Sequence, residues 1–164
     1  LMQGAVGTSN AEAFVFSTGI SRLTRQLDGR NADQALAAAA GSTAHWDSGT
    51  LLARCLRTFL DAYGRRGMAR GAVVVVFSDG WTQDNPEDVR AQMARLRRLA
   101  YRIIWVNPRK AAPGYEPFAV GIAAALPFCD AFTSGHSYDS LAELPTALAG
   151  THHHPRRTGS AHGH

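Results

Sequence analysis

The chain has 164 residues, of which 45% are hydrophobic, which is enough for one folded domain with a buried core. No apolar run approaches the roughly 20 residues that a membrane-spanning helix needs, and the first residues lack the pattern of a secretory signal. The formal net charge is +4, and without residues 151–164 the chain has 15 basic and 13 acidic residues, which gives no strong reason to expect nucleic acid as a partner.

Residues 151–164, with the sequence THHHPRRTGSAHGH, contain almost nothing that could be buried. We therefore expect a disordered tail, whose histidines could bind Ni²⁺, Zn²⁺ or Cu²⁺ opportunistically. The two cysteines, Cys55 and Cys129, lie in unlike contexts without the spacing of metal ligands. We interpret both as small buried hydrophobic residues in a reducing, cytoplasmic compartment, and a disulfide between them is the alternative.

The first part of the chain predicts two strands and a helix. EAFVFS at 12–17 is a short apolar run that is typical of a buried strand, and a second strand is plausible over 20–27. An alanine-rich helix is expected to begin at Asn31 or Asp33 and to continue through Ala40.

A polar loop at 45–50 precedes the next helix. Apolar residues recur there every three to four positions over 51–60, and Gly64 is expected to close the helix. AVVVVF at 72–77 is the clearest strand of the sequence, because it contains four β-branched valines and is apolar at every position. This pattern is typical of a parallel strand that helices cover on both sides.

Helix-start signals follow at Asn85, an N-cap candidate, and at Pro86, which fits the first helical position. The helix is expected over 86–102, and IIWV at 103–106 gives another buried strand, so 72–106 predicts a right-handed βαβ unit. Two further helices and a short strand are expected over 117–126, 138–149 and 130–133. The order of elements predicts an α/β fold, a Rossmann-like open and mostly parallel sheet with helices on both faces.

Asp79 lies where the apolar run VVVVF ends, in the stretch SDGW. Ligands of open α/β sheets bind outside the carboxyl ends of the strands, and Gly80 lets the chain turn sharply there. Burying a lone carboxylate costs free energy, so Asp79 should have a partner, which could be backbone N–H groups, a cation or a metal. The alternative is that Asp79 only accepts hydrogen bonds from its own turn.

Thr50 lies with Ser48 and Gly49 on a loop that also precedes a helix and could reach the same edge of the sheet. A hydroxyl and a carboxylate are the oxygen ligands that a hard cation such as Mg²⁺ or Mn²⁺ prefers. The alternative role of Thr50 is that of a helix N-cap or first-turn residue.

A family resemblance spans residues 12 to about 149, in the ordered segments EAFVFSTGISRLTRQL, DSGTLLARCL, RGAVVVVFSDGW, RLRRLAYRIIWVNP and GYEPFAVGIAAALPFCDAFTSGHS. The chain resembles a von Willebrand factor type A (VWA) domain, and most of all the CoxE-like subfamily. The resemblance implies a domain over 12–150, with 1–11 as the remnant of a first helix or a linker, and the tail 151–164.

VWA domains bind a divalent cation in a metal-ion-dependent adhesion site (MIDAS), in which an acidic residue of a partner fills an open position. The resemblance implies that Thr50 and Asp79 are metal ligands, with Ser48 and Gly49 shaping the loop, and that the run before Asp79 is a central parallel strand. The family's Asp-x-Ser-x-Ser loop does not occur in this chain. We therefore expect a truncated piece of a longer protein, without the family's first strand and with an incomplete cation site.

Three further features have competing interpretations. Arginines on the helix 86–102 form either a solvated face or a docking surface for an acidic partner. Trp81 either packs in the ordinary way or shields the site. His136 is not expected to be catalytic, because the chain has no nucleophile elbow of the form G-x-S-x-G.

The resemblance implies a non-enzymatic, metal-dependent protein-interaction domain. Its implied partner is a MoxR-type AAA+ ATPase, and the implied process is maturation of a carbon monoxide dehydrogenase or a related molybdenum hydroxylase. The alternatives are an α/β hydrolase or phosphotransferase that uses Asp79, and an inactive structural fragment.

Overall fold

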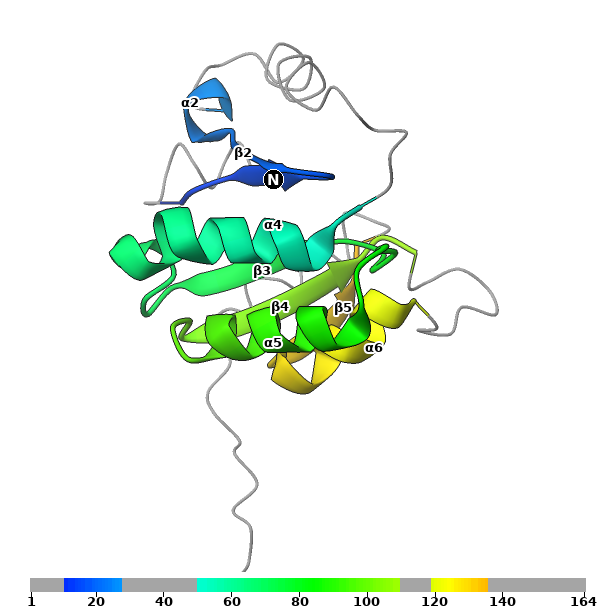
Figure 1. The fold of residues 1–164 in the computed structure, drawn as a ribbon. Helices are drawn as coiled ribbons and strands as arrows, with labels where there is room; N and C mark the ends of the chain where they lie inside the picture. The colour runs from blue at the N-terminus through cyan, green and yellow to red at the C-terminus, as the bar shows by residue number, and fades with distance from the viewer. Residues whose placement is uncertain (1–10, 28–49, 110–118, 136–164) are drawn as a thin grey trace, which may run out of the picture.

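The computed structural model describes residues 11–27, 50–109 and 119–135 (Figure 1). These residues form a short hairpin, a three-stranded sheet and the helices that accompany it. The elements in chain order are β1 (Phe14–Phe16), β2 (Ile20–Arg22), α2 (Thr24–Leu27), α4 (Leu52–Phe59), the π-helix η2 (Leu60–Met68), β3 (Val73–Phe77), α5 (Pro86–Arg97), β4 (Arg102–Asn107), α6 (Val120–Ala125), the 3₁₀-helix η3 (Leu126–Phe128) and β5 (Ala131–Ser134).

The sheet has the order β3-β4-β5, and all of its strands are parallel. Val76 of β3 lies opposite Trp105 of β4, which in turn lies opposite Phe132 of β5. Helix α5 connects β3 to β4, so the βαβ unit predicted over 72–106 is confirmed, and with it the α/β fold class.

Helices α4, α5 and α6 lie together on one face of the sheet, where α5 packs between α4 and α6 (Figure 1). Their apolar side chains meet fully buried residues of the strands, and the core includes Leu60, Val89, Met93, Leu96, Ile103, Trp105 and Ile122. On the other face, Ile104 and Val106 are also fully buried and form a separate cluster with Val75 and Ala131. The predicted helices 31–40 and 138–149 lie outside the described residues, so helices on this second face stay a prediction.

Within the described sheet, β4 is the central strand and β3 lies at the edge. The prediction that 72–77 is a central strand is therefore wrong for the described sheet, whereas its cover by helices on both faces stays a prediction. Burial follows this order, because residues 103–107 of β4 are all buried, whereas Val73 and Phe77 of β3 are each 38% exposed. The hairpin of β1 and β2 forms a sheet of its own and does not pair with β3 among the described residues.

The helix predicted to close at Gly64 continues as η2 as far as Met68. Gly64 is buried, and a Cβ atom there would lie 3.2 Å from Leu60 Cδ2 and 3.5 Å from the Cβ of Ala69. The absence of a side chain at Gly64 thus allows close packing rather than ending the helix. The left-handed backbone that interrupts the helical geometry is at Gly67, with φ of 113°.

The second predicted strand, 20–27, is a strand only as far as Arg22 and becomes the short helix α2 at Thr24. The carboxylate of Glu12 accepts hydrogen bonds from the side chains of Arg22 and Thr24. These bonds lower the pKa of Glu12 below its ordinary value, with the Arg22 bond as the larger cause. The hydrogen bonds among Glu12, Arg22 and Thr24 therefore lie where the strand changes to a helix, and they compete with continuation of the strand.

Helix α5 begins as its sequence predicts. Asn85 is the N-cap, its Oδ1 accepts a hydrogen bond of 3.0 Å from the backbone N–H of Glu87, and Pro86 occupies the first turn. Val89, Met93 and Leu96, which recur every three to four positions along the helix, are fully buried.

Both cysteines are free thiols, which agrees with the prediction of no disulfide between them. Burial raises the pKa of Cys55 to about 11 and that of Cys129 to about 12. The thiolate, which is the reactive form, is therefore scarce at neutral pH for both residues. None of the described helices is long and apolar enough to cross a membrane.

Candidate functional site

Asp79 lies in a tight turn at the carboxyl end of β3. The turn is held by its own side chains: Ser78 Oγ accepts a hydrogen bond of 3.0 Å from the N–H of Gly80, and Asp79 Oδ1 accepts one of 3.2 Å from the N–H of Trp81. The alternative interpretation of Asp79 as a turn acceptor is therefore correct for one of its two oxygens. Oδ2 accepts no hydrogen bond from a described residue, and the side chain is only partly buried.

Gly80 fits this turn for two reasons. Its φ of 78° lies in the left-handed region, which glycine adopts without a steric penalty. In addition, a Cβ atom at Gly80 would lie 2.1 Å from Ile122 Cγ1 of α6. Gly121 of α6 is equally close, because a Cβ there would lie 2.4 Å from the carbonyl oxygen of Gly80. The turn and the first residues of α6 thus pack with almost no intervening space.

Thr50 is joined to the same loop through its backbone. Its carbonyl oxygen accepts hydrogen bonds of 3.0 Å from the N–H of Gln83 and of 3.0 Å from the hydroxyl of Thr82. The structure therefore brings the segment containing Thr50 to the edge of the sheet where Asp79 lies, as the sequence predicts. No hydrogen bond joins Thr50 to Asp79, and Ser48 and Gly49 lie outside the described residues.

The N-terminus of α4 is capped by this loop and not by Thr50. The N-cap residue is Leu51, which makes no side-chain cap, so the alternative interpretation of Thr50 as an N-cap is wrong. Asp84 Oδ2 accepts a hydrogen bond of 2.7 Å from the N–H of Ala53, and Thr82 Oγ1 accepts one of 3.1 Å from the N–H of Leu52. These two side chains satisfy N–H groups that have no partner within the helix.

The hydroxyl of Thr82 also lies within hydrogen-bond distance of Asp84, with 2.9 Å between Thr82 Oγ1 and the acceptor Asp84 Oδ2. Sequence reasoning missed both residues. The available signal was a hydroxyl and a carboxylate shortly after Asp79, but Asp84 precedes Asn85-Pro86 and so suggests a role in α5. Its actual target, α4, is more than 30 residues earlier in the chain.

We predict that Asp84→Ala lowers the free energy of unfolding by about 1–3 kcal/mol, because it leaves the N–H of Ala53 without its acceptor near the positive end of α4. Denaturation in urea measures this loss. The matched control is Asp88→Ala, which removes an exposed carboxylate from the first turn of α5 and should cost less than about 1 kcal/mol. Equal losses for the two variants would contradict a special role of Asp84.

The donor atoms at this edge are oxygens, which suits a hard divalent cation. Asp79 Oδ2 and the hydroxyl of Thr50 make no hydrogen bond with a described residue. The described residues contain no group of three or more His, Cys, Asp or Glu side chains that could hold a metal. By donor type, Thr50 and Asp79 fit Mg²⁺ or Mn²⁺. These two residues form only part of the ligand set that such a cation needs.

Trp81 is 66% exposed beside Asp79, so the expectation that it packs in the ordinary way is wrong. Large exposed aromatic side chains are enriched at protein interfaces. Trp81 therefore presents an exposed aromatic side chain next to Asp79.

A family model described as VWA domain containing CoxE-like protein matches residues 1–141. The fold is the mixed α/β arrangement expected of such a domain, with Asp79 at the end of a parallel strand. The chain belongs to the VWA domain-containing CoxE-like family. Membership in this family points to protein–protein interaction rather than catalysis. No curated protein and no solved structure gives a significant match.

Proposed function

We propose that the chain is a metal-dependent protein-interaction domain that recognises an acidic residue of its partner. The observation that carries the proposal is the family match over residues 1–141, together with the position of Asp79 at the carboxyl end of β3. The hydrogen bonds from the loop after Asp79 to the backbone of Thr50 support it, because they tie the two proposed ligands to one edge of the sheet.

Thr50 and Asp79 would hold Mg²⁺ or Mn²⁺, with Ser48 and Gly49 shaping the loop before Thr50. When bound, the cation supplies a positive centre that accepts a carboxylate from the partner. The residues of this chain contribute the scaffold: the turn holds the Asp79 carboxylate through its hydrogen bond from the N–H of Trp81, and Thr82 is hydrogen-bonded to the segment that carries Thr50. Exposed Trp81 adds apolar contact area beside the charged group.

We further propose that the partner is a MoxR-type AAA+ ATPase and that the pair acts in maturation of a carbon monoxide dehydrogenase or a related molybdenum hydroxylase. CoxE-like family membership supports this process. A cytoplasmic location, as expected from the free cysteines, is where such a pair would meet.

The proposal predicts that Mn²⁺ stabilises the protein and that Asp79→Asn removes this effect. The protein should be the full chain with the five histidines of 151–164 changed to glutamine, because those histidines could bind the metal themselves. At a Mn²⁺ concentration 100 times the dissociation constant, binding to the folded state alone adds about 2.7 kcal/mol to the free energy of unfolding. Thermal unfolding with Mn²⁺ or with a chelator measures the difference.

Asp79→Asn keeps an oxygen that can accept the bond from Trp81 but removes the charge, and Asp88→Asn is the matched control. Binding to a purified MoxR-type ATPase is then measured with Mn²⁺ and with the chelator. Binding that is lost in Asp79→Asn and in the chelator supports the proposal. Binding that is equal in all conditions would show an interaction without a metal role, and no binding at all would overturn the assignment of the partner.

The alternative of a hydrolase or phosphotransferase that uses Asp79 has no specific observation in its favour. Such an enzyme needs a second acid or base placed next to the reacting group. Among the described residues, the hydrogen-bond partner of Asp79 is the backbone of Trp81.

A further inference from the structure

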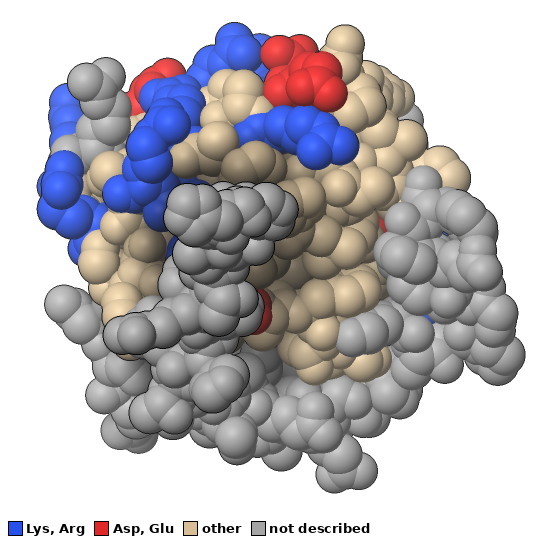
Figure 2. Space-filling view, turned by 90° about the horizontal axis from the view of Figure 1, so that it is seen from below, with Lys and Arg blue, Asp and Glu red and all other residues tan. Residues whose placement is uncertain are grey.

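The surface over α5 carries several arginines, and two of them already have partners within the chain. Figure 2 shows Lys and Arg side chains gathered on one part of the face seen from below, with acidic groups among them. Arg95 pairs with Asp61 at 2.5 Å, and Arg97 pairs with Asp130 at 2.9 Å. For these two arginines, the ion pairs favour a solvated face over a docking surface.

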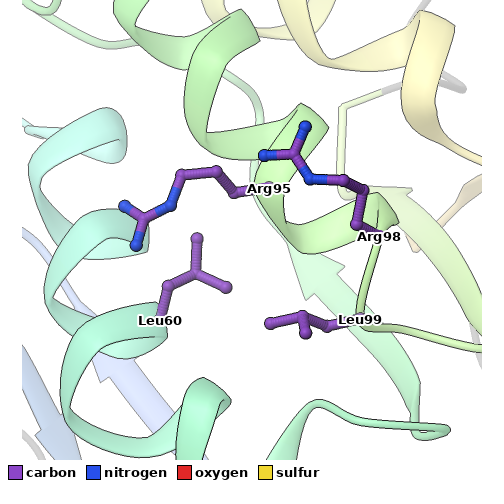
Figure 3. A pocket seen from close by; sticks show the side chains of 4 residues that line it. All are labelled: Leu60, Arg95, Arg98 and Leu99. Atoms are coloured by element: carbon purple, nitrogen blue, oxygen red, sulfur yellow. The ribbon is translucent and has the colours of Figure 1, made fainter.

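A hollow of about 260 Å³ lies at the end of α5, lined by Leu60, Arg95, Arg98 and Leu99 (Figure 3). Figure 3 shows that these side chains come from two neighbouring helical segments. Leu60 is fully buried, so the hollow has no accessible apolar floor. The loop after Asp79, in contrast, contains a side chain whose contacts link the proposed cation site to two helices.

This side chain is Thr82, which contacts α6 with its methyl group and α4 with its hydroxyl. A Cβ atom at Gly121 of α6 would lie only 3.1 Å from Thr82 Cγ2. The hydroxyl accepts a hydrogen bond of 3.1 Å from the N–H of Leu52 at the beginning of α4. Because both branches of this β-branched side chain have a contact, its χ1 angle is restricted on both sides.

The hydroxyl of Thr82 has more polar neighbours than it can bond at one time. Its two lone pairs accept the N–H groups of Leu52 and Asp84. Two acceptors then compete for its single proton, the carbonyl oxygen of Thr50 at 3.0 Å and Asp84 Oδ2 at 2.9 Å. Thr82 therefore shares one proton between the backbone of a proposed cation ligand and the carboxylate that caps α4.

The carbonyl of Thr50 is where the described residues hold this ligand in place. Both described hydrogen bonds of Thr50 are made at that oxygen, one from the N–H of Gln83 and one from the hydroxyl of Thr82. Its own hydroxyl, the proposed ligand atom, makes no hydrogen bond with a described residue. Groups that orient a metal ligand in this way typically change metal affinity by about 10–100-fold when they are removed.

We propose that Thr82 is a positioning residue for cation binding. Its hydroxyl holds Thr50 at the edge of the sheet where Asp79 lies, and Asp84 regulates this hold by competing for the same proton. Thr82 is not itself a ligand, because N–H groups already use both of its lone pairs. This role rests on the proposed function of Thr50 and Asp79 as metal ligands.

The test measures Mn²⁺ affinity from the electron paramagnetic resonance signal of free Mn²⁺, in the full chain with the five histidines of 151–164 changed to glutamine. Thr82→Val keeps the branched shape but removes the hydroxyl, so the Thr50 carbonyl loses one of its two donors. We expect the affinity to fall about tenfold or more. Thr82→Ser restores the hydroxyl and should keep the affinity within about threefold of the parent chain.

Asp84→Ala is the matched control, because it also removes an acceptor from the beginning of α4 and lowers stability in urea. Unlike Thr82→Val, it leaves the proton of Thr82 to the Thr50 carbonyl alone. The Mn²⁺ affinity of Asp84→Ala should therefore stay within about threefold of the parent chain although the protein is less stable.

Three results would overturn the positioning role of Thr82 while the metal role of Asp79 stands. They are parent-like affinity in Thr82→Val, an equal loss in Thr82→Ser, and an equal loss in Asp84→Ala, which would show that affinity only follows the stability of α4. The absence of Mn²⁺ binding in the parent chain would overturn the proposed function and the role of Thr82 together.

Discussion

Replacing Gly80 by alanine is expected to lower the free energy of unfolding by about 2–5 kcal/mol. One part, about 1–2 kcal/mol, arises because alanine is strained in the left-handed backbone at φ of 78°. The other part, about 1–3 kcal/mol, arises because the new methyl group would overlap Ile122 Cγ1 of α6. Urea denaturation followed by circular dichroism measures the loss.

Gly71→Ala separates the two causes. Gly71 has a similar φ of 70°, but a Cβ atom there meets nothing within 4 Å. It should therefore cost only about 1–2 kcal/mol, the backbone part alone. Equal losses at Gly71 and Gly80 would contradict the tight packing of the turn on α6.

The double variant Gly80→Ala with Ile122→Ala tests the contact directly. Removing the Ile122 side chain makes room for the new methyl group, so the double variant should lose at least about 1 kcal/mol less than the sum of the two single losses. Part of the overlap remains, because the backbone nitrogen of Ile122 lies 2.9 Å from the Cβ position. Additive losses would show that the two residues do not interact.

Trp105→Ala is expected to cost about 3–5 kcal/mol, because Trp105 is the largest fully buried side chain of the described core. Its indole N–H also donates a hydrogen bond of 2.8 Å to the carbonyl oxygen of Ser78, directly before Asp79. Trp105→Phe keeps most of the apolar volume but leaves that carbonyl without its donor, so it should cost about 1–3 kcal/mol. Urea denaturation measures both losses.

Trp81→Ala is the matched control, because it removes the same type of side chain from a position that is 66% exposed. Its effect on stability should stay within about 0.5 kcal/mol. If the proposed cation site is real, Trp105→Phe should also weaken Mn²⁺ binding, because it loosens the strand end that carries Asp79. Comparable destabilisation by the Trp81 and Trp105 substitutions would contradict the core position of Trp105.

The βαβ unit could be predicted from sequence because its signals are local. The β-branched run of β3, the Asn85 cap and the buried stripe of α5 each depend on neighbours within one or two turns of the chain. The position of Asp79 at a strand end follows from the same pattern. The structure adds that one oxygen of Asp79 is used by its own turn.

Two errors show where local patterns fail. Gly64 resembles a helix end, but its lack of a side chain serves close contact with Leu60 and Ala69 while the helix continues. Thr50 resembles an N-cap, but α4 takes its cap from Asp84, which is distant in the sequence. In both cases a residue type has two uses, and only its neighbours in space decide between them.

The sequence by itself determined the α/β class and the order of the elements of the central unit, because periodicity and capping residues act over short distances. It also carried the CoxE-like resemblance, through the ordered series of segments along the chain. The tertiary structure decided which strand is central, and it joined Thr82 and Asp84 to α4. These features depend on how elements pack, and the packing contacts join residues that are far apart along the chain.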